Sequence, residues 1–152
     1  MALLSDPWSP VEVRQLVEAP RDDVFNFVAN PETYPKWLVG AQQIRDVDDD
    51  FPEPGAAFEH SVGASPEVSV DDSTVVIEAH GHRQLVLEAH VGPIKAKVEF
   101  DFVRRGEQTE IVMRERPMGP AQALTPLIRP MLALRNRVSM QRLARCVAED
   151  QD

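Results

Sequence analysis

The sequence has only one cysteine, Cys146, among its 152 residues, so no disulfide can form within the chain. A single cysteine also excludes a metal site built from cysteines alone. Basic residues are few as well, with 16 Lys and Arg against 25 Asp and Glu, which gives a formal net charge of -9. A surface of this sign repels phosphate backbones, so we expect no nucleic-acid partner.

Long hydrophobic runs are absent too. No stretch approaches the roughly 18 apolar residues of a membrane span, and the first ten residues, MALLSDPWSP, lack the basic start of a secretory signal. We therefore expect a cytoplasmic protein without stable membrane insertion. The length and the 43% hydrophobic content predict one domain over residues 1–152, with a sizeable core over about residues 9–149.

Several catalytic and metal-binding motifs are missing. The sequence contains no G-x-S-x-G motif and no glycine-rich phosphate loop. His80 and His82 form an H-x-H pair with His90 nearby, but Gly81 interrupts the strand that would align the pair for a metal. We expect no metal and no other cofactor.

The first forty residues predict a strand and two short helices. Residues 11–19 are rich in β-branched side chains, and Pro20 ends them. Pro20 followed by Asp22 and Asp23 is typical of a helix N-terminus, and this helix ends at residues 30–31. Proline at position 35 limits the next segment to a second short helix or turn.

From residue 41 the hydrophobic period becomes two, which predicts antiparallel strands. We expect them over 41–48, 56–63, 73–80, 83–91, 94–103 and 109–115, with 65–72 as a loop. The last third has helical spacing from about residue 121 to 149, in two apolar stripes. One stripe contains Leu124, Leu127, Ile128, Met131, Leu134 and Val138, and the other contains Leu132, Met140, Leu143 and Val147.

This order of elements predicts an α+β fold. A twisted antiparallel sheet curls around a long helix, and space remains between them if the two short helices close one end.

The sequence resembles the START/Bet v 1-like (SRPBCC) superfamily, specifically its bacterial polyketide cyclase/dehydrase and lipid-transport group. The resemblance covers about residues 9–149 and is carried by five segments: EAPRDDVFNFVANPETYPKW, PGAAFEHSVG, RQLVLEAHVGPIKAKVEFDF, TEIVMRERPMGP and LRNRVSMQRL. It implies a helix-grip fold with an apolar ligand cavity between sheet and C-terminal helix. Members include cyclases, dehydratases, lipid carriers and co-chaperones, so the fold does not choose the function.

Two inward-facing residues are candidates for acid–base chemistry. Glu115 is in phase with Ile111 and Met113, and a carboxyl group beside a cavity can move protons on a ligand. The alternative is a structural carboxylate paired with Arg135, Arg116 or a helix N-terminus. His60 is in phase with Phe58 and could shuttle a proton near neutral pH, or it could be a hydrogen-bonded core histidine.

Aromatic and apolar residues are candidates for ligand binding. We expect Tyr34 and Trp37 at the mouth of the cavity, stacked on a flat ligand, although they could simply close one end of the core. Arg135 and Asn136 could donate to a ligand carbonyl or carboxylate, or bridge helix and sheet. The other predicted binding residues are Phe58, Phe100, Phe102, Met113, Leu127, Ile128 and Met131.

Three functions follow as hypotheses. The first is binding of a small hydrophobic molecule, such as a polyketide-like compound, an isoprenoid or a lipid. The second is a cofactor-independent polyketide cyclase or dehydratase in which Glu115 and His60 transfer protons. The third is a co-chaperone-like interaction module without a cavity. Antiparallel edge strands could also pair two copies into a homodimer.

Overall fold

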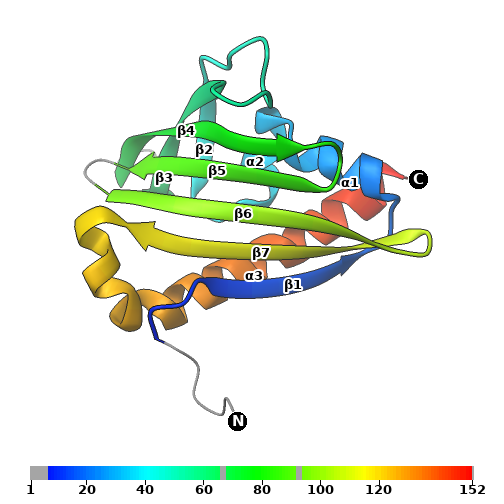
Figure 1. Ribbon diagram of the computed structural model, residues 1–152. Coiled ribbons are helices and arrows are strands. Elements are labelled where there is room, and N and C mark those ends of the chain that lie inside the picture. The colour runs from blue at the N-terminus through cyan, green and yellow to red at the C-terminus, as the bar shows by residue number, and fades with distance from the viewer. Residues whose placement is uncertain (1–6, 66–67, 92–93, 152) are drawn as a thin grey trace.

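The computed structural model describes residues 7–65, 68–91 and 94–151. Its centre is a seven-stranded antiparallel sheet in the order β1-β7-β6-β5-β4-β3-β2, seen in Figure 1. The strands are β1 Val11–Val17, β2 Ala41–Arg45, β3 Ala57–Ser65, β4 Val68–His80, β5 Gln84–Val91, β6 Ile94–Arg105 and β7 Gln108–Met118. Strands β2 to β7 form a meander, and β1 completes the sheet beside β7.

The helices lie at two points in the chain. Between β1 and β2 come α1 Arg21–Val28, the 3-10 turn η1 Pro31–Thr33 and α2 Tyr34–Trp37; after β7 come the 3-10 turn η2 Gly119–Leu124 and α3 Thr125–Asp150. Helix α1 begins at Arg21 with Pro20 as its N-cap, and Asp22 and Asp23 lie in its first turn, as the sequence predicts. The side chain of Asn30 accepts a hydrogen bond of 3.1 Å from the backbone N–H of Glu32, which starts η1.

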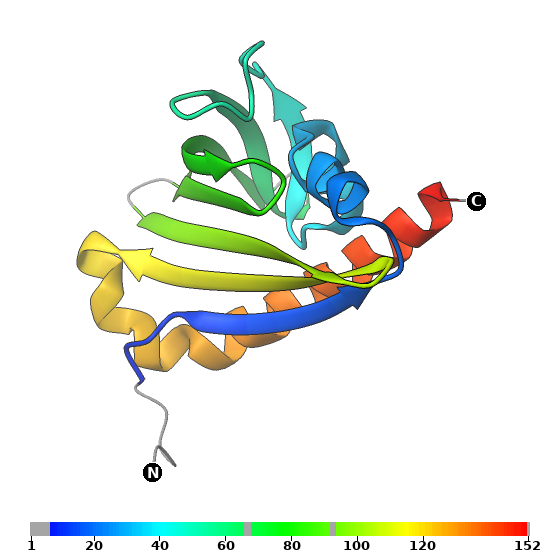
Figure 2. The same cartoon turned by 45° about the vertical axis from the view of Figure 1, so that its right-hand side comes forward.

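Helix α3 packs against the sheet with one face. It packs mainly against β1 and α2 and also contacts β7 and α1, and Figures 1 and 2 show it running along β1. The helix is 26 residues long, and the curved antiparallel sheet around it is the predicted helix-grip arrangement. Its buried residues are Thr125, Leu132, Asn136, Ser139, Met140, Leu143 and Val147.

The structure shows which apolar stripe of α3 is buried. Of the two apolar stripes, the stripe through Leu132 and Met140 is the buried one, whereas Leu127 is 78% exposed and Leu134 is 65% exposed. Both stripes have helical spacing, so periodicity alone could not show which of them is buried. The contact with β1 decides which one is covered.

The sheet bends strongly, as Figure 2 shows. Shifts of register interrupt the ladders between Val76 and Glu78 and between Ala41 and Ile44, and such irregularities increase the local twist. Strand β4 already begins at Val68, so the loop predicted over 65–72 is wrong for most of its length. Asp72, an acidic residue of that segment, faces inward on β4 and pairs with His60.

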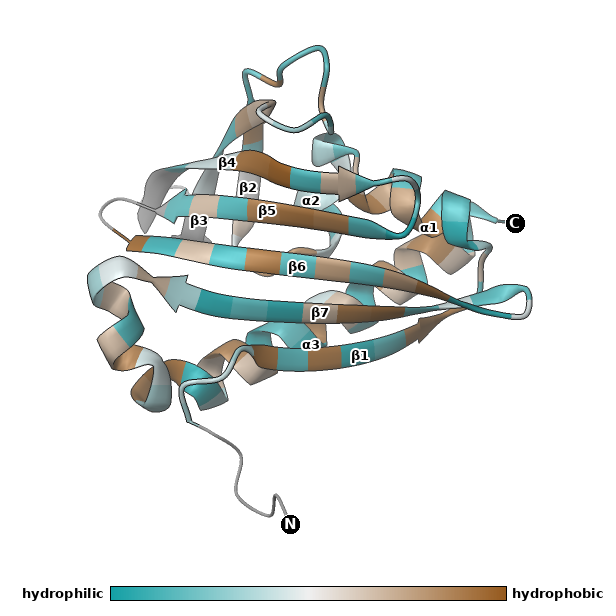
Figure 3. Cartoon of the chain, in the orientation of Figure 1, coloured by the Kyte–Doolittle hydropathy of each residue, from teal (hydrophilic) through white to brown (hydrophobic). Residues whose placement is uncertain are grey.

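Hydrophobic and polar residues alternate along the strands, and this alternation determines which face of the sheet is buried. Bands of brown and teal alternate along β1 in Figure 3, and the buried side chains of Val11, Val13 and Val17 form its inner face. Aromatic rings meet edge to face in the core, for example Phe25 with Phe102 at 5.2 Å between ring centroids. The concave face therefore carries the core.

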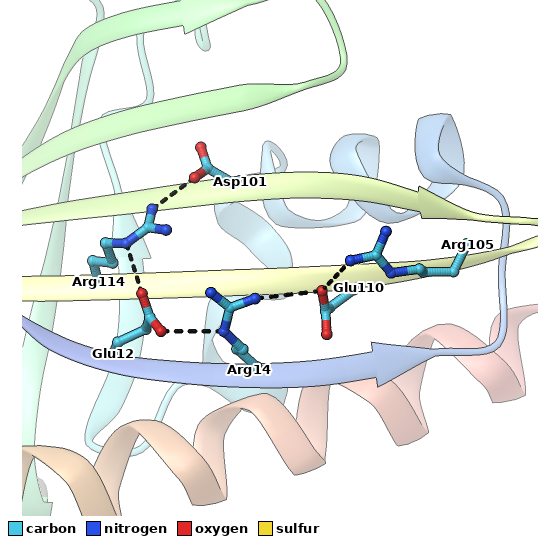
Figure 4. A network of polar contacts seen from close by, with 6 residues as sticks. All are labelled: Glu12, Arg14, Asp101, Arg105, Glu110 and Arg114. Carbon is cyan, nitrogen blue, oxygen red and sulfur yellow. Dashed lines mark hydrogen bonds and ion pairs between the residues drawn. The ribbon is translucent and has the colours of Figure 1, made fainter. Parts of the chain in front are cut away.

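The outer face of β1, β7 and β6 carries a chain of ion pairs, drawn in Figure 4. Glu12 accepts hydrogen bonds from Arg14 Nε at 3.1 Å and from Arg114 Nε at 2.9 Å. Arg114 also donates to Asp101 at 2.6 Å, so it joins β7 to both neighbouring strands. The chain continues through Glu110, which pairs with Arg14 and with Arg105.

These pairs predict a pH dependence of stability. Burial acts to raise the pKa of Glu12, but its hydrogen bonds and charge interactions with Arg14 and Arg114 outweigh burial and hold the pKa below the ordinary 4.5. The contribution of Glu12 is therefore complete above about pH 4.5 and is lost as the pH falls through the folded-state pKa. We expect Glu12→Gln to lower the free energy of unfolding by at most about 1 kcal/mol at neutral pH, since the pairs are exposed.

Urea unfolding between about pH 7 and pH 3 measures this effect. The difference between wild type and Glu12→Gln should shrink as the medium becomes acidic. Glu107→Gln, in the exposed β6–β7 turn, is the matched control and should show no such trend. A gap between wild type and Glu12→Gln that stays constant down to pH 3 would contradict the assignment.

Candidate functional site

A cavity of about 330 Å³ lies between the concave face of the sheet and helices α2 and α3. Most of its lining is apolar and comes from five strands and both helices. The apolar and aromatic lining residues are Tyr34, Trp37, Leu38, Leu87, Ala89, Ile94, Ala96, Val98, Phe100, Ile128, Met131 and Leu132. The polar and charged ones are His60, Asp72, Thr74, Glu115 and Arg135.

Two alanines leave room for the cavity. Ala89 on β5 and Ala96 on β6 both line it and face each other directly across the ladder. In the neighbouring inward row the corresponding pair is Leu87 and Val98, whose larger side chains fill more of the space. A methyl group on both strands at one level produces a hollow that the adjacent level does not have.

The exposed lining residues mark the mouth of the cavity. Ile94 is 49% exposed and Met131 is 61% exposed, so the mouth lies between the start of β6 and the first turns of α3. The prediction that Tyr34 and Trp37 sit at the mouth is wrong, because both are buried. Trp37 Nε1 donates to Thr33 Oγ1 at 3.1 Å, which fixes the indole in the closed wall.

One group of polar residues joins α3 to β7. Asn136 is fully buried, and its Nδ2 donates to Glu115 Oε1 at 2.9 Å. Arg135 Nη1 lies 3.6 Å from the same carboxylate oxygen. Arg135 Nε donates to the carbonyl oxygen of Val39 at 3.2 Å, while the N–H of Val39 donates to Ser139 Oγ at 3.0 Å. These bonds also hold the segment after α2 against α3.

A second group of polar residues lies on β3 and β4. His60 and Asp72 are directly opposite each other in the ladder, and His60 Nε2 is 3.0 Å from Asp72 Oδ2. Thr74 Oγ1 is 3.4 Å from the same ring nitrogen. All three side chains are buried. The carboxylate orients the imidazole, an arrangement that also prepares histidines for proton transfer.

Three buried polar atoms of cavity-lining residues have no hydrogen-bond partner among the described residues. They are Tyr34 Oη, His60 Nδ1 and Asp72 Oδ1. Burial raises the pKa of the Tyr34 hydroxyl above its ordinary value of 10.0, so the hydroxyl is neutral at physiological pH. Buried polar atoms are nearly always paired, so these three are exceptions in the described part of the chain.

The structure brings most of the predicted site residues to this one cavity. They are Glu115, His60, Tyr34, Trp37, Phe100, Ile128, Met131 and Arg135. Glu115 and His60 belong to separate polar groups, however, because β4, β5 and β6 lie between their strands. The two are therefore not in contact as an acid–base pair.

Four predicted binding residues lie outside the lining. Phe58 sits behind the wall, with its ring centroid 5.1 Å from those of Tyr34 and His60. Phe102 packs against Phe25 of α1. Met113 is buried in the core between β1 and β6, since it is paired with Val13 and Phe100. Leu127 is exposed on the outer side of α3.

Asp72 and Thr74 are cavity residues that the sequence reasoning missed. They alternate with Val76, which is buried, so a period of two extended back from 76 would have placed both on the inner face. The loop expected over 65–72 left Asp72 outside the predicted strand. Asn136, by contrast, shares a helix face with Leu132 and Met140, and this spacing predicts that it is at least partly buried.

Metal binding finds no support in the described part of the chain, where no group of three or more His, Cys, Asp or Glu side chains could hold an ion. His80, His82 and His90 each lie beside a different single carboxylate, of Glu78, Asp22 and Glu88 respectively. Within the same described residues, no helix combines the length and apolarity of a membrane span.

Sequence comparison now identifies the family. Residues 18–128 match the AHSA1 family, described as Activator of Hsp90 ATPase homolog 1-like protein. The chain belongs to this family. The AHSA1 family is part of the SRPBCC/Bet v 1-like superfamily, so the resemblance of the sequence to this superfamily is confirmed. No curated protein is significantly similar in sequence.

Solved structures share the fold of this AHSA1 family member at low sequence identity. NE0264 from Nitrosomonas europaea is 16% identical with a TM-score of 0.74, over 97% of this chain and 99% of that one. CV1439 from Chromobacterium violaceum is 13% identical with a TM-score of 0.73, over 91% and 97%. StfQ, a di-domain ARO/CYC from the steffimycin biosynthetic pathway, is 14% identical with a TM-score of 0.71, over 95% of this chain and 52% of StfQ.

The bond between Asn136 and Glu115 predicts a large effect on stability. Asn136→Ala removes the donor and leaves a buried carboxylate with only a long contact to Arg135. We expect the free energy of unfolding to fall by about 2 kcal/mol, because a buried charged group then lacks its hydrogen bond. Chemical denaturation measures the change.

A double-mutant cycle with Glu115→Gln isolates this interaction from other effects of the substitution. Asn136→Ala should cost less in the Glu115→Gln background, by about 1 kcal/mol or more, since the uncompensated charge is gone. Strictly additive effects of the two substitutions would show that the bond contributes nothing.

Proposed function

We propose that this protein binds a small, largely apolar ligand in the cavity between sheet and α3. The cavity itself is the observation that carries the proposal: about 330 Å³, lined mainly by aliphatic and aromatic side chains with a few polar groups. This volume and lining are typical of small-molecule sites. The exposed side chains of Ile94 and Met131 at its mouth offer an apolar path for entry.

The ligand classes that fit are a polyketide-like compound, an isoprenoid or a lipid. Trp37, Phe100 and Tyr34 give the closed wall aromatic surfaces against which a flat ligand could lie. The fold shared with StfQ, a di-domain ARO/CYC from the steffimycin biosynthetic pathway, supports the polyketide-like class within this proposal.

A cyclase or dehydratase is the second candidate. It is favoured by one observation, namely that Glu115 and His60 both line the same cavity. Because they lie on strands β7 and β3, they would act at different positions of a bound poly-carbonyl chain. Arg135 or Tyr34 would polarise a carbonyl oxygen close to each.

A co-chaperone-like module without a cavity is not supported. That hypothesis requires a filled core, and the cavity contradicts it. Its other expectation, exposed apolar surface, is met by Leu127, Met131 and Leu134 on α3. Of these three residues, only Met131 lines the cavity, where it can also serve ligand entry.

Some further expectations rest on sequence alone and stand as part of this proposal. They are a cytoplasmic location, based on the lack of a long apolar run, and the absence of a nucleic-acid partner, based on the net charge of -9. A homodimer could form through β1 or β2, the two edge strands of the sheet.

Filling the cavity should abolish binding. Ala96→Phe places a ring in the hollow that the alanine pair leaves. We expect the affinity for the hydrophobic dye Nile red to fall by about tenfold or more. The protein should stay folded, because the phenyl ring occupies space that is empty in the wild-type cavity. Dye fluorescence titration and circular dichroism measure the two effects.

Lys95→Phe is the matched control, since Lys95 is the preceding residue on β6 and is exposed on the opposite face. It adds the same ring outside the cavity and should leave dye affinity within about threefold. If wild type binds neither Nile red nor any component of a lipid extract, the proposed function fails.

The enzymatic alternative has its own test. Glu115→Gln and His60→Gln should each reduce turnover of a short poly-β-carbonyl thioester by about 100-fold or more, because a positioned acid or base is removed. Product formation is followed by absorbance, and circular dichroism verifies folding. Unchanged turnover in Glu115→Gln would remove Glu115 from the mechanism.

A further inference from the structure

We propose that the outward face of helix α3 docks on an anionic lipid bilayer, with the mouth of the cavity turned toward the lipid. Docking of this kind is peripheral and reversible, as it is for other amphipathic helices at membrane interfaces. The docking surface does not depend on the cavity, whereas its use, the exchange of an apolar ligand with the bilayer, rests on the proposed function. Three observations carry the inference: an exposed apolar stripe, the arginines beside it, and the position of the cavity mouth.

Helix α3 carries an apolar stripe that the described part of the chain leaves uncovered. Leu127, Met131 and Leu134 are 78%, 61% and 65% exposed, and Leu124, in the turn just before the helix, is 49% exposed. At 3.6 residues per turn, the three helical residues fall within about 60° of one another around the axis, on the side away from the buried face of α3. Single exposed apolar residues are ordinary, but a contiguous stripe marks an interaction surface.

The second half of the same outward face is basic. Arg145 follows Leu127 by about five complete turns, so it lies in line with the apolar stripe, and Arg142 lies on its flank. Arg137 borders the outward face on the other side. All three arginines are exposed, and none has a side-chain partner among the residues that the structure describes. The face therefore continues from apolar to cationic, a combination that binds the interface of anionic membranes.

The net charge of -9 does not oppose this docking, because the charges are unevenly distributed. Helix α3 contains five arginines and two acidic residues, both at its C-terminal end, so its net charge is +3. Five acidic residues lie within 46–53, between β2 and β3. This segment is at the top of the molecule in Figures 1 and 2, whereas α3 runs along the lower part. Since exposed charges beyond a Debye length of about 8 Å are largely screened, an anionic surface meets mainly the charge of α3.

The position of the cavity mouth favours a bilayer over other occupants of this face. Met131 belongs both to the apolar stripe and to the cavity lining, and Ile94 at the mouth is 49% exposed. An apolar ligand dissolves better in a bilayer than in water, so a mouth beside the docking face lets the ligand enter without crossing water. A second copy of the chain fits less well, because two such faces would bring arginines of like charge together.

Sedimentation with lipid vesicles tests the basic part of the surface. Wild type should bind phosphatidylcholine vesicles containing about 30% phosphatidylglycerol at least about tenfold more tightly than vesicles of phosphatidylcholine alone, and added salt should weaken this binding. Arg142→Gln/Arg145→Gln should lower the affinity for the anionic vesicles by about tenfold or more, since each basic residue near such a surface contributes about fivefold. Arg83→Gln/Arg104→Gln removes the same charge from exposed positions outside α3 and should stay within about threefold of wild type.

The apolar part of the surface has its own variant. Leu127→Gln should weaken binding to the anionic vesicles by about tenfold, because an apolar side chain no longer enters the interface. Glutamine and leucine have similar helix propensities, so the melting temperature should not change. Leu127 does not line the cavity, so the affinity for Nile red should stay within about threefold. Ile77→Gln, at a 42% exposed position on β4, is the matched control and should bind the vesicles as wild type does.

The outcomes separate the docking surface from the cavity. If wild type does not bind the anionic vesicles, or if the control variants weaken binding as much as the α3 variants do, the docking surface is overturned, while Nile red binding still supports the proposed function. If wild type is a dimer in size-exclusion chromatography and Leu127→Gln is a monomer, a second copy covers the stripe and the bilayer is overturned as its occupant. Vesicle binding without Nile red binding would instead support the docking surface and remove its use in ligand exchange.

Discussion

Helix α3 can turn only one face toward the sheet, and the shape of the interior depends on which face that is. Leu132, Asn136, Met140, Leu143 and Val147 take the buried side, and the helix packs along β1. Its second half contributes to the core, whereas its first half only borders the cavity. Because Asn136 bonds to Glu115 and Ser139 binds the segment after α2, the rotation of the helix is fixed as well.

The cavity follows from this grip together with a local choice of small side chains. The sheet continues past the helix. At the level of Ala89 and Ala96, the inward side chains of both strands are too small to fill the space between sheet and helix. Tyr34 and Trp37 close one end, which leaves the side near Ile94 and Met131 as the opening. A site of this kind combines a rigid apolar wall with a small number of polar groups, as ligand selection requires.

The polar residues divide into two groups with different character. The group of Glu115, Asn136 and Arg135 is largely paired internally and stabilises the contact between helix and sheet. The group of His60 and Asp72 retains unpaired atoms. The two groups lie on different strands of the same cavity, so substitutions in them should have separable effects.

The sequence alone determined the fold class, the order of the elements and the inward phase of β6 and β7, because period-two alternation is a local property that burial of one face enforces. It also placed Glu115 and His60 inward by the same reasoning. Only the tertiary structure decided that Asp72 stands opposite His60, that Leu127 is exposed and that Tyr34 and Trp37 form the closed wall. Strand register, helix rotation and the direction of the opening depend on contacts between residues far apart in the chain, and a periodic pattern contains no information about those contacts.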